Sequence, residues 1–177
     1  MKSFTFAASL LAASAMAGNT ADWKKRSVYQ VLTDRFATSN GNKNACTDLS
    51  NYCGGTYQGI VDNLDYIQGL GFDAVWISPI IENLAGGYHG YWATNWENVN
   101  TNFGSKEDLS NFVKECHKRD IWVMVDVVAN HVAPIGFDFS KIYPLNHSEH
   151  YHADCDINWN DQNSVENCRL AGLPDLN

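Results

Sequence analysis

The sequence predicts an α/β fold built around a parallel β-sheet. Three apolar segments, at residues 27–32, 72–79 and 121–128, have the composition of short buried strands. Between them lie two segments, at residues 60–70 and 105–116, in which apolar side chains recur at helical spacing. This strand, helix, strand, helix, strand order is typical of parallel strands joined by right-handed helical crossovers.

The first half of this pattern starts with a β-rich run at residues 27–32, which ends in the polar residues Thr33, Asp34 and Arg35. After a long loop, the predicted helix 60–70 stops at Gly71, and its apolar face consists of Ile60, Leu64, Ile67 and Leu70. Residues 72–79 follow, are apolar on both faces and end at Pro79. A buried parallel strand has this appearance.

The second half contains the clearer helix. Ser105 is expected to cap it, with Asp108 completing a capping box, and the apolar face carries Leu109, Phe112, Val113 and Cys116. The strongly apolar residues 121–128 form the third strand, whereas residues 88–101 look aromatic and irregular. From residue 132 to residue 177 the periodicity fades and Asp, Asn, His and Pro dominate, which indicates a functional, loop-rich subdomain.

Three parallel strands cannot close a barrel. A complete (β/α)₈ barrel takes about 250 residues, so this sequence supplies at most the first three βα units of one, in truncated form. Residues 18–131 hold these predicted strands and helices, and residues 132–177 form the irregular region that follows the third strand.

The first 17 residues have the pattern of a secretory signal peptide. Lys2 provides a charged start, an apolar run follows at residues 4–13, and Ala15 and Ala17 form a small-residue cleavage site. The apolar run is too short to cross a bilayer, which needs about 20 residues. We expect residues 1–17 to be removed and the product to be secreted into the extracellular space.

Composition narrows the class of partner. The chain has 12 Lys and Arg against 20 Asp and Glu, a formal net charge of −8 at pH 7. Such a charge repels nucleic acid and anionic lipid, so we expect no nucleic-acid partner and no membrane partner. A neutral substrate or a cation fits better, and the 12% of aromatic residues suits stacking on sugar rings. We expect a monomer.

Five cysteines follow an export signal, so disulfides are expected and one cysteine is left over. Cys46 and Cys53 bracket one polar stretch, and Cys155 and Cys168 bracket another, so we pair each set locally. Cys116 lies within the apolar face of the second helix, where a free thiol acts as a small hydrophobic side chain.

Polar groups are concentrated at the end of the third strand. Asp126, Asn130 and His131 leave it within six residues. In parallel α/β folds the carboxyl ends of the strands carry the loops that build sites. Strand-end capping by Asp and Asn explains the same residues, and chemistry alone does not separate the two interpretations.

Three segments together resemble the secreted fungal branch of the α-amylase clan of glycoside hydrolases. They are Asp126-Val127-Val128-Ala129-Asn130-His131, Tyr88-His89-Gly90-Tyr91-Trp92 and Leu173-Pro174-Asp175-Leu176. The resemblance runs from about residue 21 to the end of the sequence and also includes Leu32-Thr33-Asp34-Arg35-Phe36 and Val75-Trp76-Ile77-Ser78-Pro79. It implies a catalytic (β/α)₈ barrel with an irregular domain inserted after the third strand, of which this sequence is the N-terminal portion.

The resemblance also implies roles for single residues. Asn130, Glu166 and Asp175 match oxygen ligands of the family's calcium ion, Ca²⁺. Tyr91, Trp92 and His131 match residues that contact the sugar at the cleavage subsite, and Asp126 and His89 match residues that organise the site. The substrate implied is starch or a maltooligosaccharide.

No catalytic residue is assigned. Retaining glycosidases need two carboxylates, about 5 to 5.5 Å apart. In this family the catalytic carboxylates follow strands four, five and seven, beyond Asn177, so we expect the complete enzyme to perform endo-hydrolysis of α-1,4-glucosidic bonds and this polypeptide alone to be inactive. Two alternatives are a sister activity, α-glucosidase or glucanotransferase, and a non-catalytic secreted carbohydrate-binding fragment.

One modification site is predicted. Asn146-His147-Ser148 is an Asn-x-Ser sequon in the polar region after the third strand, so Asn146 is expected to be glycosylated.

Overall fold

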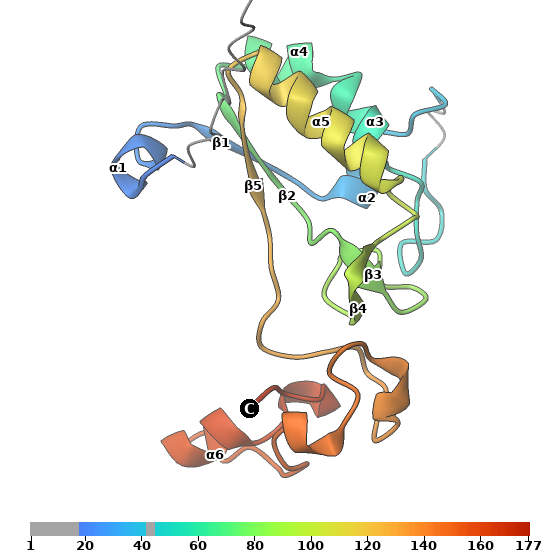
Figure 1. Ribbon diagram of the computed structural model, residues 1–177, viewed down its shortest axis with the longest axis vertical. Coiled ribbons are helices and arrows are strands. Elements are labelled where there is room, and N and C mark those ends of the chain that lie inside the picture. The colour runs from blue at the N-terminus through green and yellow to red at the C-terminus, as the bar shows by residue number, and fades with distance from the viewer. Residues whose placement is uncertain (1–17, 42–44) are drawn as a thin grey trace, which may run out of the picture.

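A computed structural model describes residues 18–41 and 45–177 of the chain (Figure 1). The predicted signal peptide, residues 1–17, lies outside the described residues. Figure 1 shows a sheet with helices grouped beside it, and an extended segment that leads from the last strand into a separate C-terminal region.

The parallel sheet predicted from the sequence is present. Its strands are β1 (Val28–Val31), β2 (Ala74–Ile77) and β5 (Trp122–Val125). They pair in the order β1-β2-β5, and both pairings are parallel. Each strand is shorter than its predicted segment at both ends. Just beyond the carboxyl end of β2, Ser78 Oγ accepts a hydrogen bond of 3.0 Å from the Thr33 backbone N–H.

The best-predicted helix is α5 (Lys106–Lys118). Ser105 caps it, and both hydrogen bonds of the capping box with Asp108 are formed. Phe112 and Cys116 on its inner face are buried. Cys116 is a free thiol among the described residues, as predicted, and burial raises its pKa to about 12.

The prediction of one continuous helix over residues 60–70 is wrong. The structure has two short helices instead, α3 (Tyr57–Val61) and α4 (Leu64–Gly69). The break falls at Asn63, whose side-chain amide donates a hydrogen bond of 2.8 Å to the carbonyl of Gly59 and whose backbone leaves the helical region. Ile60, Leu64 and Ile67 are nevertheless buried, because both short helices turn the same apolar face inward.

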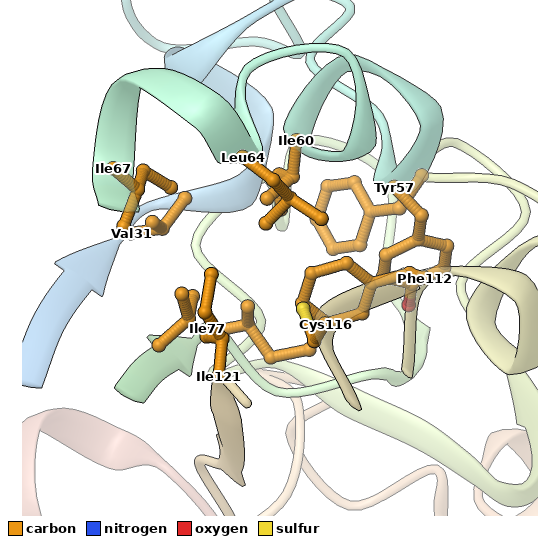
Figure 2. Packing of buried hydrophobic residues seen from close by; sticks show 11 residues of the cluster. Val31, Tyr57, Ile60, Leu64, Ile67, Ile77, Phe112, Cys116 and Ile121 are labelled. Carbon is orange, nitrogen blue, oxygen red and sulfur yellow. The ribbon is translucent and has the colours of Figure 1, made fainter. Parts of the chain in front are cut away.

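The main core lies between these helices and the sheet (Figure 2). Tyr57 and Phe112 stack there with ring planes 21° apart, and Ile77 of β2 and Ile121 before β5 close the cluster from the sheet side. Burial of an aromatic or aliphatic side chain of this kind stabilises a fold by about 1.5–3 kcal/mol. The helices are thereby fixed on the sheet, and the strand ends keep a defined position.

Residues 88–101 were expected to be irregular, and this expectation is wrong for their second half. β4 (Ala93–Val99) pairs antiparallel with β3 (Ile81–Asn83) across an irregular register. Its small, polar and aromatic residues follow one another without the apolar–polar alternation that would mark a strand in the sequence. The pair stands beyond the carboxyl end of β2 (Figure 1).

The region after β5 is loop-rich, as predicted. It contains α6 (Gln162–Asn167) and the 3₁₀ turns Phe139–Lys141, Ser148–His150 and Leu170–Gly172. A second core holds it together, formed by Val132, Ala133, Phe139, Ile142 and Tyr151. Trp92, directly before β4, and Trp96, within it, pack against this core, so the segment around β4 connects the region to the rest of the molecule.

The two remaining helices lie near β1: α1 (Thr20–Trp23) precedes it, and α2 (Thr33–Phe36) follows it directly. Both predicted disulfides are present, Cys46–Cys53 and Cys155–Cys168. Across the two described ranges, 18–41 and 45–177, no helix has the length and apolar character needed to span a bilayer.

Candidate active-site rim and cation pocket

The carboxyl ends of β1, β2 and β5 open on the same edge of the sheet, because all three strands are parallel. Asp126 follows β5 there, and the turn that precedes β4 brings Tyr91 to the same edge. The Tyr91 hydroxyl donates a hydrogen bond of 2.7 Å to Asp126 Oδ2. A small cavity of about 260 Å³ lies at this contact and is lined by Tyr91, Asp126, Ser78 and residues of β1 and β2.

His131 reaches the same turn from the other side. Its Nε2 lies 3.0 Å from the carbonyl oxygen of Tyr91. Since a carbonyl only accepts, Nε2 carries the proton, and Nδ1 is free to accept from the Asn130 side-chain amide at 3.3 Å. Tyr91 is therefore held at two points, its hydroxyl by Asp126 and its carbonyl by His131.

His89 supports this turn from within. Its Nδ1 accepts a hydrogen bond of 3.0 Å from the Tyr91 backbone N–H, and its ring stacks on the Tyr91 ring at 15°. The edge of Trp92 meets the same imidazole at a centroid distance of 4.8 Å. The five residues expected at the sugar site, namely Tyr91, Trp92, His131, Asp126 and His89, thus form one connected group.

Two pKa values at this rim are shifted. The hydrogen bond to Asp126, with help from desolvation and the charge of that carboxylate, raises the pKa of Tyr91 to about 12. Burial lowers the pKa of His89, and the neighbouring His131 lowers it further. Both shifts favour neutral side chains, which suits contact with an uncharged ligand.

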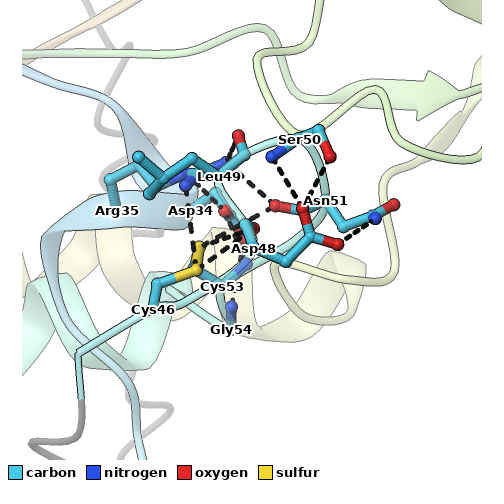
Figure 3. Close-up of a disulfide and its surroundings, with 9 residues drawn as sticks. All are labelled: Asp34, Arg35, Cys46, Asp48, Leu49, Ser50, Asn51, Cys53 and Gly54. Atoms are coloured by element: carbon cyan, nitrogen blue, oxygen red, sulfur yellow. Dashed lines mark hydrogen bonds and ion pairs between the residues drawn. A yellow bond between two sulfur atoms is a disulfide. The ribbon is translucent and has the colours of Figure 1, made fainter.

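Sequence reasoning missed the role of Arg35 beside this rim. The guanidinium lies 3.8 Å from the centroid of the Tyr88 ring, and its Nη2 donates to the carbonyl oxygens of Leu49 and Asn51 at 2.9 Å each. Those two carbonyls belong to the loop that the Cys46–Cys53 disulfide closes (Figure 3). Arg35 therefore links the disulfide loop to the segment that carries Tyr91 and Trp92.

Asp34 holds the end of the same loop through hydrogen bonds to its backbone. Its side chain is fully buried, accepts hydrogen bonds from the backbone N–H groups of Cys53 and Gly54, and lies 3.0 Å from Arg35 Nε. Asp34 was recognised only as a polar residue at a strand end. A larger cavity of about 800 Å³ opens beside Asp34, Arg35 and Tyr88.

The three predicted calcium ligands line one cavity. Asn130, Glu166 and Asp175 border a pocket of about 460 Å³ together with His152 and Trp159. Backbone bonds bring Asn130 and Asp175 side by side: Leu176 N–H donates to the Asn130 carbonyl at 2.8 Å, and Val132 N–H donates to the Pro174 carbonyl at 3.0 Å. Glu166, on α6, lines the same pocket.

Each of these three side chains keeps an oxygen available within the part of the chain that the structure describes. Glu166 Oε1 accepts from Gln162, and Asp175 Oδ2 lies 2.9 Å from His152 Nδ1, while the second carboxylate oxygen of each has no hydrogen-bond partner there. One amide and two carboxylates form the donor set of a hard cation such as Ca²⁺. Among the same described residues, no three His, Cys, Asp or Glu side chains converge closely enough to hold a metal by themselves.

The structure places the remaining predicted site elsewhere. Asn146 lies on the exposed surface, and its two sequon partners, His147 and Ser148, are exposed as well. Sequence reasoning missed His152 and Trp159 in the cation pocket, because neither belongs to a segment with a recognisable pattern.

Comparison with known proteins decides the family. A family model described as the catalytic domain of α-amylase matches residues 30–166. The chain belongs to the α-amylase family. α-Amylase 1 of Schwanniomyces occidentalis is 47% identical over 171 residues, which cover 87% of this chain and 33% of that protein.

Solved α-amylase structures have the same fold over the described region. An α-amylase from Malbranchea cinnamomea aligns with a TM-score of 0.83 at 46% identity, covering 88% of this chain and 36% of that one. The α-amylase of Geobacillus thermoleovorans, solved in complex with acarbose, aligns with a TM-score of 0.77 at 38% identity and covers 88% and 34%. This chain therefore spans about a third of the length of the relatives that it matches.

Proposed function

We propose that this chain forms the N-terminal part of a secreted, endo-acting hydrolase of α-1,4-glucosidic bonds in starch and related glucans. Its three parallel strands are then the first three of a (β/α)₈ barrel, residues 18–131, and residues 132–177 belong to the domain inserted after the third. The observation that carries the proposal is the connected group Tyr91, Asp126 and His131 at the carboxyl edge of the sheet, in a chain of the α-amylase family.

The rim suits recognition of an uncharged sugar. Tyr91 and Trp92 offer ring faces that can cover the apolar side of a pyranose, and His89 and Asp126 hold the Tyr91 ring in place. Both ring nitrogens of His131 already have partners, so a sugar hydroxyl has to replace Tyr91 O or the Asn130 amide to bond with it. We assign His131 to sugar binding through such an exchange of partners, and no described residue is assigned as nucleophile or general acid.

We further propose that Asn130, Glu166 and Asp175 hold a calcium ion in the cation pocket. When bound, the ion supplies a fixed double positive charge between residues that come from two regions of the chain. Asn130 follows β5, whereas Glu166 and Asp175 belong to the C-terminal region, so a shared cation fixes that region on the barrel edge. The neighbouring His131 is then held in the orientation that the rim requires.

A binding experiment tests the sugar site in the chain itself. Maltoheptaose is titrated into the chain without its predicted signal peptide, residues 18–177, while tryptophan fluorescence is recorded, with the β-linked cellohexaose as the control ligand. We expect saturable quenching by maltoheptaose only, and a loss of about tenfold in affinity, or about 1.4 kcal/mol, for Trp92→Ala. Trp159→Phe, in the cation pocket, serves as the matched tryptophan control. Equal responses to both glucans, or none to maltoheptaose, would contradict the proposal.

The alternative activities differ in their products. An α-glucosidase releases single glucose units from chain ends, and a glucanotransferase forms cyclic or transferred products, whereas endo-hydrolysis shortens starch from within. Chromatography of early products from the complete enzyme separates all three. A non-catalytic binding fragment would show glucan binding without any product.

A further inference from the structure

We propose that His152 is a positioning residue that fixes the Asp175 carboxylate for cation binding. The inference rests on the proposed calcium site and adds to it a residue from outside the ligand set. Its basis is the contact between His152 Nδ1 and Asp175 Oδ2 at 2.9 Å, inside the cavity that Asn130 and Glu166 also line.

The contact is sheltered from water. The side chain of His152 is 22% exposed and that of Asp175 is 15% exposed. A carboxylate oxygen can only accept, so Nδ1 carries the proton and donates to Oδ2. A hydrogen bond to a charged, largely buried acceptor is among the stronger ones in a protein, because water competes for it weakly.

The backbone repeats the link between the same two residues. The His152 backbone N–H donates to the carbonyl oxygen of Asp175 at 2.9 Å, and the neighbouring pair Tyr151 and Leu176 forms an antiparallel bridge. His131 and Asp175 form a second bridge on the opposite side. The segment around Asp175 therefore lies between the segment that carries Asn130 and the segment that carries His152.

His152 itself is held firmly. Arg169 Nε donates to its carbonyl oxygen at 3.3 Å, and Arg169 follows Cys168 of the second disulfide. The preceding Tyr151 stacks on Phe139 with ring planes 16° apart in the core of the C-terminal region. The imidazole is thus attached to the rigid part of this region and can act as a fixed reference for the carboxylate.

This arrangement determines which carboxylate oxygen a cation meets. With Oδ2 bonded to His152, rotation of the Asp175 carboxylate is restricted, and Oδ1 has no hydrogen-bond partner among the described residues. A cation then binds a carboxylate that is already oriented, and the ordering cost on binding falls. Outer-shell partners of this kind typically change metal affinity by about 10- to 100-fold when removed.

The test uses terbium(III), an oxygen-seeking probe whose emission is sensitised by a nearby tryptophan. Trp159 lines the cation pocket and provides the sensitiser. Terbium(III) is titrated into residues 18–177 at pH 7 while its emission is recorded, and Ca²⁺ is then added to displace it. Asp175→Asn tests the proposed site, and Trp159→Phe confirms that the emission arises in this pocket.

Two conservative variants separate positioning from general structure. In His152→Asn the amide nitrogen falls near the place of Nδ1 and can still donate to Asp175, whereas in His152→Gln it falls near the place of Nε2 and cannot. His117→Gln, on the exposed face of α5, controls for the loss of a histidine. Thermal unfolding with excess chelator checks that each variant folds before its affinity is compared.

We expect His152→Asn and His117→Gln to bind Ca²⁺ about as tightly as the parent, and His152→Gln to bind about tenfold more weakly or worse. Suppose that the parent binds Ca²⁺, that Asp175→Asn does not, and that His152→Asn and His152→Gln bind it equally tightly. This result would overturn the positioning role of His152 and leave the proposed calcium site standing. Absence of displaceable terbium in the parent, or full affinity in Asp175→Asn, would overturn the calcium site and this inference with it.

Discussion

The hydroxyl of Tyr91 donates a hydrogen bond of 2.7 Å to Asp126 Oδ2, and this bond joins the turn before β4 to the end of β5. It connects two predicted site residues that lie 35 positions apart in the sequence. The aromatic ring that is proposed to meet the sugar is therefore fixed by the carboxylate that was assigned only an organising role.

Replacement of Tyr91 by Phe removes this bond and keeps the ring. Because Tyr91 is 39% exposed, we expect a modest loss of about 1 kcal/mol in the free energy of unfolding at pH 8. The folded-state pKa of about 12 lies above the ordinary value of 10.0, so the contribution is complete below pH 10 and is lost as the pH rises toward 12. Urea unfolding of parent and variant at pH 8, 10 and 11 measures it. A difference that stays constant over this range would contradict the account.

Acid should weaken the rim through His89. Its pKa is lowered in the fold by burial and by His131, so the unfolded chain takes up a proton before the folded chain does. Stability is therefore highest above the unfolded pKa of about 6.5 and falls as the pH drops below it. We expect His89→Gln to lose less stability than the parent between pH 7 and pH 5, measured by urea midpoints. His117→Gln is the exposed control, and a parent-like slope for His89→Gln would refute the assignment.

Arg35→Lys keeps the charge and removes the planar group that reaches Tyr88 and two carbonyls at once. The fully buried Asp34 also loses its partner at 3.0 Å. We expect a loss of about 2–3 kcal/mol in the free energy of unfolding, since an imperfectly paired buried carboxylate is costly. Lys25→Ala removes an exposed ion pair with Asp22 and should cost less than about 1 kcal/mol. Similar losses in the two variants would show that Arg35 is an ordinary surface cation.

Asn146 should carry an N-linked glycan when the chain passes through a secretory pathway. Its exposure, together with that of His147 and Ser148, leaves the sequon accessible. We expect treatment with an amide-cleaving glycosidase to lower the mass of the secreted protein, and Asn146→Gln to have the lower mass from the start. An unchanged mass after treatment would rule out the modification.

Much of the fold was predictable because its signals are local and repeated. The three strands are apolar runs between polar ends, and the start of α5 is marked in the sequence by the capping box of Ser105 and Asp108. The break at Asn63 depends on one side chain that bonds to Gly59, which helical spacing of apolar residues does not reveal. The β3 and β4 pair was missed because its irregular register gives no alternating pattern.

The site residues likewise fall into those that the sequence could predict and those that it could not. Asp126, Asn130 and His131 stand at the end of a predicted strand, so their shared location follows from the parallel sheet. His152 and Arg35 depend on contacts across loops: His152 meets a carboxylate 23 positions away, and Arg35 meets carbonyls inside a disulfide loop. Such contacts depend on the conformation of loops that are distant in the sequence. Single residues in loops show no periodic pattern from which that conformation could be predicted.

The most direct test joins residues 18–177 of this chain to the remaining part of the Malbranchea cinnamomea α-amylase and measures starch hydrolysis. The account predicts a chimera that unfolds cooperatively, releases reducing ends from starch and retains the anomeric configuration in its products. Trp92→Ala in the chimera should lower kcat/KM by about tenfold or more, which is about 1.4 kcal/mol of transition-state binding, while His117→Gln should leave it unchanged. A chimera that unfolds cooperatively and binds Ca²⁺ but hydrolyses no starch would contradict the account.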